Sequence, residues 1–128
     1  MEAFRMKRIV IGVTGSIAAY KTCDLVFSLR KADARPVVVM TEAAARLVTP
    51  ETFRALSGEA THLGMWDDAA SAMPHITLVE DADLVIVAPA TANFLAKLAH
   101  GIADDLLSTL LLTATCPVVV APAMNVEM

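Results

Sequence analysis

The sequence predicts an α/β protein with an open, mostly parallel sheet and helices on both of its faces. Apolar runs without alternating polar residues are typical of strands that are buried on both faces of a parallel sheet. Four such runs occur, at residues 9–13, 37–40, 84–88 and 118–121. Segments with helical spacing of apolar and charged residues separate them, and a strand, a helix and a parallel strand in succession form a right-handed crossover unit.

Composition is consistent with a single domain over residues 1–128. Of the 128 residues, 56% are hydrophobic and 19% are charged, and single domains cluster at about 100–150 residues. Charged residues interrupt every apolar run before it reaches the ~18–20 residues that a membrane-spanning helix needs. We therefore expect the many hydrophobic residues to pack in a core or against other subunits, and we expect no membrane contact.

Several other classes of protein are disfavoured. The net charge of −4 argues against nucleic-acid binding, which needs clustered cations. Cys23 and Cys116 lie far apart without Cys-x-x-Cys spacing, so neither a disulfide scaffold nor a metal site is expected. The first five residues contain no apolar signal-peptide core, so we expect a cytoplasmic protein.

The first half of the chain contains one clear crossover helix and a less regular segment. Residues 17–31 place apolar side chains on one helical face and charged ones on the other. Thr49 and Pro50 resemble an N-cap and a first helical residue, and they predict a short helix that ends at Ser57 and Gly58. A short third strand is expected at residues 60–63.

Two further helices are predicted at residues 93–99 and 104–114, and the second begins with two acids that suit a helix N-terminus. Together these elements predict at least five strands in the order of about 3-2-1-4-5. This is a Rossmann-like, three-layer arrangement. Ligands of such sheets bind beyond the carboxyl ends of the strands, where the strand order reverses. The loops at that point are residues 14–16 and 89–93.

The first of these loops is a candidate anion site. Gly15 permits close approach of the backbone, Ser16 offers a hydroxyl, and the following helix offers free amides. The alternative is a tight turn without a ligand. Gly15 to Thr22 also resembles a nucleotide-binding P-loop, but Tyr20 replaces its second glycine. A helix-forming residue there would prevent the loop from curling around a phosphate, so we reject this motif.

The second loop, with Thr91 and Asn93, could hold a flat ring against small residues, or Asn93 could simply cap the next helix. His75 could act as a base or be a structural histidine, and His62 and His100 are weaker candidates. Asp104 and Asp105 are adjacent, so they cannot form a shared-proton pair on a helix and are expected to be helix-start acids. Asn125 follows the last strand, where it could bind a carboxylate or act as a cap.

These residues together resemble the homo-oligomeric flavin-containing cysteine decarboxylases. The resemblance spans residues 8–128, and its motifs are Gly15-Ser16-Ile17-Ala18-Ala19-Tyr20-Lys21, His75-Ile76, Ala82-Asp83-Leu84, Ala88-Pro89-Ala90-Thr91-Ala92-Asn93, Lys97, Gly101-Ile102-Ala103-Asp104-Asp105-Leu106-Leu107-Ser108 and Ala121-Pro122-Ala123-Met124-Asn125 with Met128. It is strongest to the branch of coenzyme A biosynthesis. The family usually continues beyond Met128 with a last strand and a cysteine-bearing flap, so a flavoprotein domain without these parts is expected.

The resemblance implies a bound FMN and the oxidative decarboxylation of a cysteine carboxylate. His75 would be the catalytic base, and Asn125 would bind the substrate carboxylate. The cofactor-binding positions implied by the family are Gly15, Ser16, Thr41, Pro89, Ala90, Thr91, Ala92 and Ala123. The implied substrate is 4′-phosphopantothenoylcysteine, converted towards 4′-phosphopantetheine.

The resemblance also implies a homo-oligomer that is a trimer or a multiple of one, with the flavin site between subunits. Two alternatives stay open. The chain could belong to a decarboxylase that acts on peptidyl cysteine, or it could be a flavin-binding regulatory subunit without turnover. Because both His75 and Asn125 are retained, an enzyme is expected.

Overall fold

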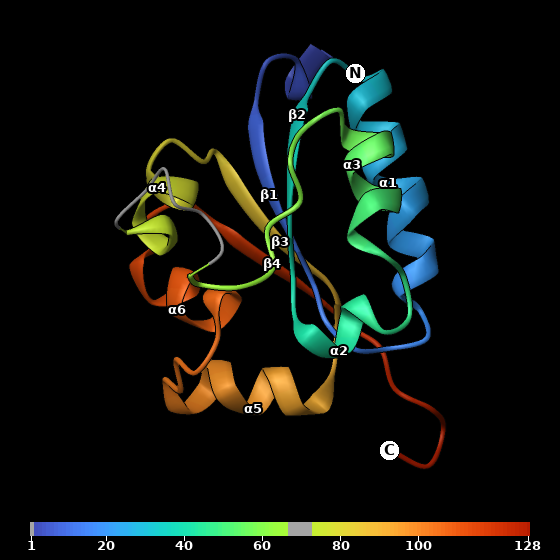
Figure 1. Ribbon diagram of the computed structural model, residues 1–128, viewed down its shortest axis with the longest axis vertical. Coiled ribbons are helices and arrows are strands. Elements are labelled where there is room, and N and C mark those ends of the chain that lie inside the picture. Colours follow the sequence, from blue (N-terminus) through green and yellow to red (C-terminus); the bar gives the residue numbers. More distant parts are fainter. Residues whose placement is uncertain (1, 67–72) are drawn as a thin grey trace.

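The computed structural model describes residues 2–66 and 73–128. Four parallel strands form one sheet in the order β2-β1-β3-β4 (Figure 1). In chain order the elements are η1 Glu2–Phe4, β1 Arg8–Val13, α1 Ala19–Lys31, β2 Arg35–Met40, α2 Glu42–Ala45, α3 Pro50–Ser57, α4 Pro74–Glu80, β3 Leu84–Ala90, α5 Ala92–His100, α6 Leu106–Thr113 and β4 Val118–Pro122.

The predicted α/β class and the order of the four main strands are confirmed, but the predicted third strand, at residues 60–63, is wrong. Residues 60–63 make a single parallel bridge between His62 and Val39. The backbone N–H of Met40 donates to the His62 carbonyl at 2.8 Å, and the N–H of His62 donates to the Val38 carbonyl at 2.9 Å. Thr61 instead donates its hydroxyl to the Pro50 carbonyl at 2.9 Å. This bond ties the segment to α3, so in the described residues the pairing with β2 does not extend into a strand.

Helices cover both faces of the sheet, as the sequence predicts. One core joins Ile9, Ile11 and Val38 to α1, α2 and α3, and the other joins Val10 and Val85 to α4, α5 and α6. Figure 1 shows α1 and α3 on one side of the strands and α4 and α6 on the other, with α5 below the carboxyl ends. The strands are apolar on both faces because each face meets a layer of helices.

Helix boundaries follow local chemistry. The predicted α3 has Pro50 in its first turn and ends at Gly58, whose φ of 76° is a left-handed conformation that glycine adopts easily. Two helices were not expected from the sequence: α2, which has four residues, and α4, which has seven. The β-branched residues of α4 favour a strand when taken alone, but its packing against α6 overrides this preference. None of the helices in residues 2–66 and 73–128 is long and apolar enough to cross a membrane.

A cleft at the carboxyl ends of the strands

A cleft of about 830 Å³ lies beyond the carboxyl ends of β1, β2 and β3. This volume is in the usual range for small-molecule sites, and its position is the one predicted for the sheet. The cleft is lined by Thr14, Gly15, Thr41, Glu42, Ala43, Leu63, Gly64, Met65, Trp66, Thr91, Ala92, Asn93, Phe94, Lys97, Ala103, Asp104, Asp105, Leu106 and Met128.

Thr14 connects the two loops that the sequence predicts to meet. Its hydroxyl donates to the Pro89 carbonyl at 2.6 Å and accepts from the Thr91 N–H at 3.0 Å. A third bond, from the Thr14 N–H to the same Pro89 carbonyl, measures 3.3 Å. Thr14 is 1% exposed, so its hydroxyl fixes the Thr91 loop. Sequence reasoning missed this role, although the position of Thr14 directly after the first strand was a usable signal.

Gly15 brings the start of the α1 loop against α2. A Cβ atom at this position would lie 2.5 Å from the Cβ of Ala43, closer than two carbon atoms can approach without a shift. Ser16 follows, and its hydroxyl oxygen accepts from the Ala18 N–H at 3.1 Å. Tyr20 and Lys21 lie in α1, which agrees with the rejection of a P-loop.

Threonines cap two of the helices that begin at the cleft. The Thr41 hydroxyl accepts from the Ala44 N–H at 3.2 Å at the start of α2, and the Thr91 hydroxyl accepts from the Phe94 N–H at 3.1 Å at the start of α5. The alternative in which Asn93 caps this helix is therefore wrong, because Thr91 takes that place. Asn93 is the second residue of α5 and is exposed in the cleft.

A group of charged residues lines the cleft at α5 and just before α6. Lys97 Nζ contacts Asp104 Oδ1 at 2.8 Å and Asp105 Oδ2 at 3.9 Å. The hydrogen bond with Asp104 raises the pKa of Lys97, and the same bond lowers the pKa of Asp104. With Glu42, the charged side chains that line the described cleft are three acids and one lysine, and that lysine is already paired.

The prediction that the two acids begin a helix is confirmed for Asp105, the N-cap of α6. Asp105 Oδ1 accepts from the Ser108 N–H at 2.7 Å, and the Ser108 hydroxyl accepts from the Asp105 N–H at 3.1 Å, which forms a reciprocal capping box. The helix is also held close to the sheet. A Cβ on Gly12 would lie 2.6 Å from Leu107 Cδ1, so the glycine in β1 leaves room for the buried Leu107 side chain of α6.

Two of the predicted functional residues lie outside the described cleft lining. The backbone of His75 is the second residue of α4, but its side chain lies outside the described part of the structure. Asn125 is exposed, and its Oδ1 atom accepts from the Met128 N–H at 3.1 Å in the turn after β4. In Figure 1 this end of the chain extends away from the strands. His62 bridges to β2, and His100 ends α5.

The cofactor positions implied by the resemblance divide into two groups. Gly15, Thr41, Thr91 and Ala92 line the cleft. The other four are not among the lining residues: Ser16, Pro89, Ala90 and Ala123. Pro89 and Ala90 are buried at the end of β3, where the Ala88–Pro89 bond is cis, and the Ala123 N–H donates to the Ala90 carbonyl at 3.1 Å. These residues shape the backbone of the loop beneath the cleft.

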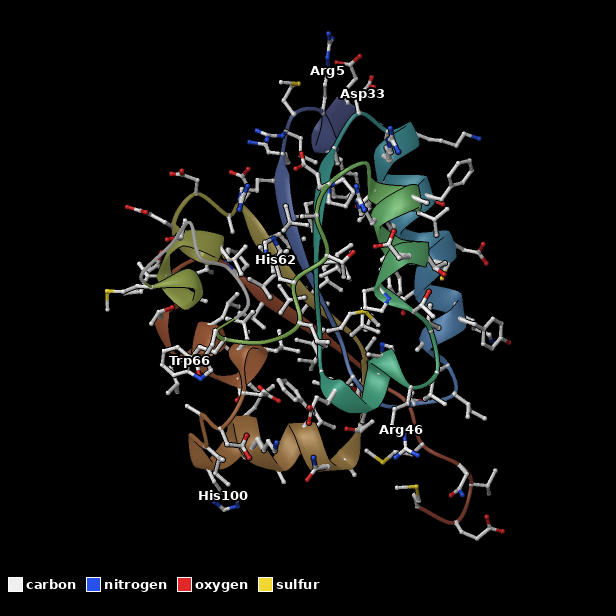
Figure 2. All side chains as sticks on the ribbon, in the orientation of Figure 1. Arg5, Asp33, Arg46, His62, Trp66 and His100 are labelled. Carbon is white, nitrogen blue, oxygen red and sulfur yellow. The ribbon has the colours of Figure 1, made fainter. Side chains whose placement is uncertain are left out.

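Sequence reasoning missed the side of the cleft formed by residues 63–66. These residues have no helical or strand periodicity, and only the presence of a tryptophan, the single one in the chain, sets them apart. Figure 2 shows His62 over the sheet and Trp66 further along the same segment, on the side of α6.

Comparison with known proteins agrees with this architecture. The Flavoprotein family matches residues 2–128. The coenzyme A biosynthesis bifunctional protein CoaBC of Haemophilus influenzae is 52% identical over 123 residues, which are 95% of this chain and 31% of that protein. The protein of the same name from Bacillus subtilis is 50% identical, over 95% of this chain and 30% of that protein. The chain thus spans about a third of the length of these relatives.

Two solved structures are similar in fold as well as in sequence. The FMN-dependent cysteine decarboxylase SpaF has a TM-score of 0.91 and 38% identity, over 97% of this chain and 72% of that one. A mutant PPC decarboxylase in complex with pantothenoylaminoethenethiol has a TM-score of 0.78 and 28% identity, over 95% of this chain and 69% of that one. With the family match over nearly the whole chain, this similarity shows that the chain belongs to the Flavoprotein family.

Proposed function

We propose that this chain is an FMN-dependent carboxy-lyase domain that decarboxylates 4′-phosphopantothenoylcysteine towards 4′-phosphopantetheine in coenzyme A biosynthesis. The observation that carries this proposal is the cleft, which gathers strand-end hydroxyls and amides at the carboxyl edge of the sheet. The named relatives with about 50% identity support the choice of substrate.

The residues of the cleft fit FMN. Gly15 packs closely on Ala43 and is itself exposed near the start of α1, and helix N-termini favour phosphate. Gly15 and Ser16 would hold the phosphate, and Thr41, Thr91 and Ala92 would contact the ribityl chain and the ring. The acids before α6 lie on the other side of the β3 end from the start of α1 (Figure 1), and the third acid of the cleft, Glu42, is next to Ala43 in α2. The preference for an anionic group near Gly15 and Ser16 therefore rests on the N-terminal end of α1. When bound, FMN supplies an acceptor for a hydride.

The chain's own residues would handle the substrate. His75 is the proposed base that takes the thiol proton while the carbon that bears sulfur is oxidised. Asn125 is the proposed carboxylate ligand. Because its oxygen already accepts the Met128 N–H, its amide nitrogen is free to donate to a carboxylate, which has only acceptors.

The experiment is to load the purified protein with FMN and to measure carbon dioxide release from 4′-phosphopantothenoylcysteine. We expect release together with a loss of the oxidised flavin absorbance when oxygen is excluded. A protein that retains FMN and neither bleaches nor releases carbon dioxide would contradict the proposed activity. A protein that takes up no FMN would contradict the proposed cofactor.

A peptidyl-cysteine decarboxylase is the second candidate, since SpaF is named a cysteine decarboxylase and superposes well on this chain. Competition separates the two. A peptide with a C-terminal cysteine should slow the reaction of the phosphopantothenoyl substrate only weakly if coenzyme A biosynthesis is the correct assignment. Preferential decarboxylation of the peptide would support the alternative.

We also propose a cytoplasmic homo-oligomer, a trimer or a multiple of one. The family resemblance supports this assembly, and so does the composition, since 56% of the 128 residues are hydrophobic and a small domain leaves apolar surface that other subunits can cover. Sedimentation of the FMN-bound protein tests this, and a stable monomer at micromolar concentration would contradict it.

A further inference from the structure

Trp66 combines strong exposure with a place at the cleft. It is the only tryptophan in the chain, it is 89% exposed, and it lines the cleft with the strand-end loops. An indole carries one of the largest apolar surfaces of any side chain. A single exposed apolar residue is common on protein surfaces, but ligand sites are lined by apolar and aromatic side chains, so the place of Trp66 in the cleft lining makes it a candidate for ligand contact.

The backbone that leads to Trp66 is held in place. The backbone of His62 makes two hydrogen bonds with β2: its carbonyl accepts at 2.8 Å and its N–H donates at 2.9 Å. Leu63 packs against one core cluster and Met65 packs against the other. The residue therefore follows a fixed segment, and an indole has only two side-chain torsions to order when a ligand binds.

Trp66 also provides a surface that the other lining residues lack. The aromatic residues of the described lining are Trp66 and Phe94, and Phe94 is 2% exposed. Met128 and Asn93 are also exposed lining residues, but neither side chain is aromatic. A flat ligand in the described cleft would therefore find its accessible aromatic partner at Trp66.

We propose that Trp66 is a ligand-contacting residue of the cleft that stacks on one face of a planar, electron-poor aromatic ring. Aromatic side chains bind flat heterocycles through offset stacking, and the electron-rich indole complements such a ring. The inference rests on the proposed function, in which this ring belongs to FMN.

The single tryptophan makes the test direct, because all indole fluorescence of the protein comes from Trp66. FMN is titrated into the protein, and bound FMN is measured separately by ultrafiltration. We expect the emission to fall as FMN binds. Energy transfer alone could cause that fall, so acrylamide accessibility is the deciding readout. It should decrease several-fold at saturating FMN, because the ring covers the indole.

Variants give an independent readout of affinity. Trp66→Ala should weaken FMN binding about three- to tenfold, the range expected for loss of one stacking contact, and Trp66→Phe should retain most of the affinity. Phe27→Ala is the matched control, since Phe27 is a half-exposed aromatic residue of α1 outside this cleft. It should bind FMN like the wild type. Circular dichroism checks the fold of each variant, and the acrylamide measurement needs no variant.

The outcomes separate the two proposals. FMN retained at wild-type affinity by Trp66→Ala, with Trp66 equally accessible to acrylamide before and after binding, would overturn the stacking contact and leave the proposed function in place. No FMN retained by the wild type would overturn the cofactor and the contact together. Protection that depends on protein concentration in the absence of FMN would also overturn the contact, because a second copy would then cover Trp66.

Discussion

A hydrogen bond of 3.0 Å from the Thr91 N–H to the Thr14 hydroxyl joins the loops that follow β1 and β3. The same hydroxyl donates to the Pro89 carbonyl at 2.6 Å, so one buried oxygen serves as donor and acceptor. These two strands are neighbours in the sheet but are separated by more than 70 residues of sequence. β1 and β3 are held side by side by strand pairing, and the Thr14 hydroxyl then fixes the position of the Thr91 loop at the cleft.

Thr14→Val should lower the free energy of unfolding and weaken FMN binding. Valine has no hydroxyl, so the Pro89 carbonyl loses one donor and the Thr91 N–H loses its acceptor on residue 14. A buried polar group that is left unsatisfied costs about 1–3 kcal/mol. Urea unfolding and FMN titration measure the two effects. Thr14→Ser keeps the hydroxyl and is the matched control. A loss in Thr14→Ser with none in Thr14→Val would show that the methyl group matters and the hydrogen bonds do not.

Gly15→Ala should disturb the cleft through one contact. The new Cβ would lie 2.5 Å from the Ala43 Cβ, and both atoms are attached directly to the backbone, so one loop must move. Overpacking of this kind costs about 1–3 kcal/mol, and FMN affinity should fall with it.

The double variant Gly15→Ala with Ala43→Gly removes the clashing methyl group and tests this cause. It should recover FMN affinity, with a residual loss of stability of about 1 kcal/mol for glycine in a helix. A double variant that binds FMN no better than Gly15→Ala would indicate that the ligand itself needs the space at Gly15.

The sheet could be predicted from the sequence because its signal is local. Runs such as residues 84–88 are apolar at every position, and only strands covered on both faces need that pattern. Residues 60–63 do not form the predicted strand, because Thr61 bonds to α3 and only His62 pairs with β2. Such a choice between partners depends on tertiary contacts that no local pattern records.

The cleft was predictable in part for a similar reason. Its place follows from the strand order, and Gly15, Thr41 and Thr91 stand where strands end. Residues 63–66 were missed because they belong to no periodic element. Asn93 was the only cap considered for α5. Asparagine and threonine have similar propensities at this position, and only the bond from the Phe94 N–H to the Thr91 hydroxyl shows that Thr91 is the cap.

The ion pair between Lys97 and Asp104 should make stability depend on pH at both extremes. The lowered pKa of Asp104 adds stability above the ordinary carboxyl pKa of about 3.9, and this contribution disappears as the pH falls through the lowered value. The raised pKa of Lys97 adds stability below the ordinary lysine pKa, and this contribution disappears as the pH rises through the raised value.

Asp104→Asn should therefore lower the urea midpoint of unfolding at pH 7. The difference between the midpoints of the variant and the wild type should shrink as the pH falls below about 4. The effect should be small, because Asp104 is exposed and screened by solvent. Asp24→Asn, a change of an exposed acid on α1, is the charge-matched control. If the midpoint of Asp104→Asn differs from that of the wild type by the same amount at pH 7 and at pH 3, the pH dependence does not come from the Lys97–Asp104 ion pair.

His75→Asn should abolish carbon dioxide release while FMN binding stays nearly unchanged. General base catalysis contributes about 10²–10⁴ in rate, and the imidazole is the proposed acceptor of the thiol proton. Flavin content and carbon dioxide release are measured on the same preparation, so that a loss of fold appears as a loss of both. His100→Asn is the control, because His100 is exposed at the end of α5 and should leave both quantities intact. Release at the wild-type rate by His75→Asn would remove His75 from the reaction, and loss of flavin together with activity would assign it a structural role.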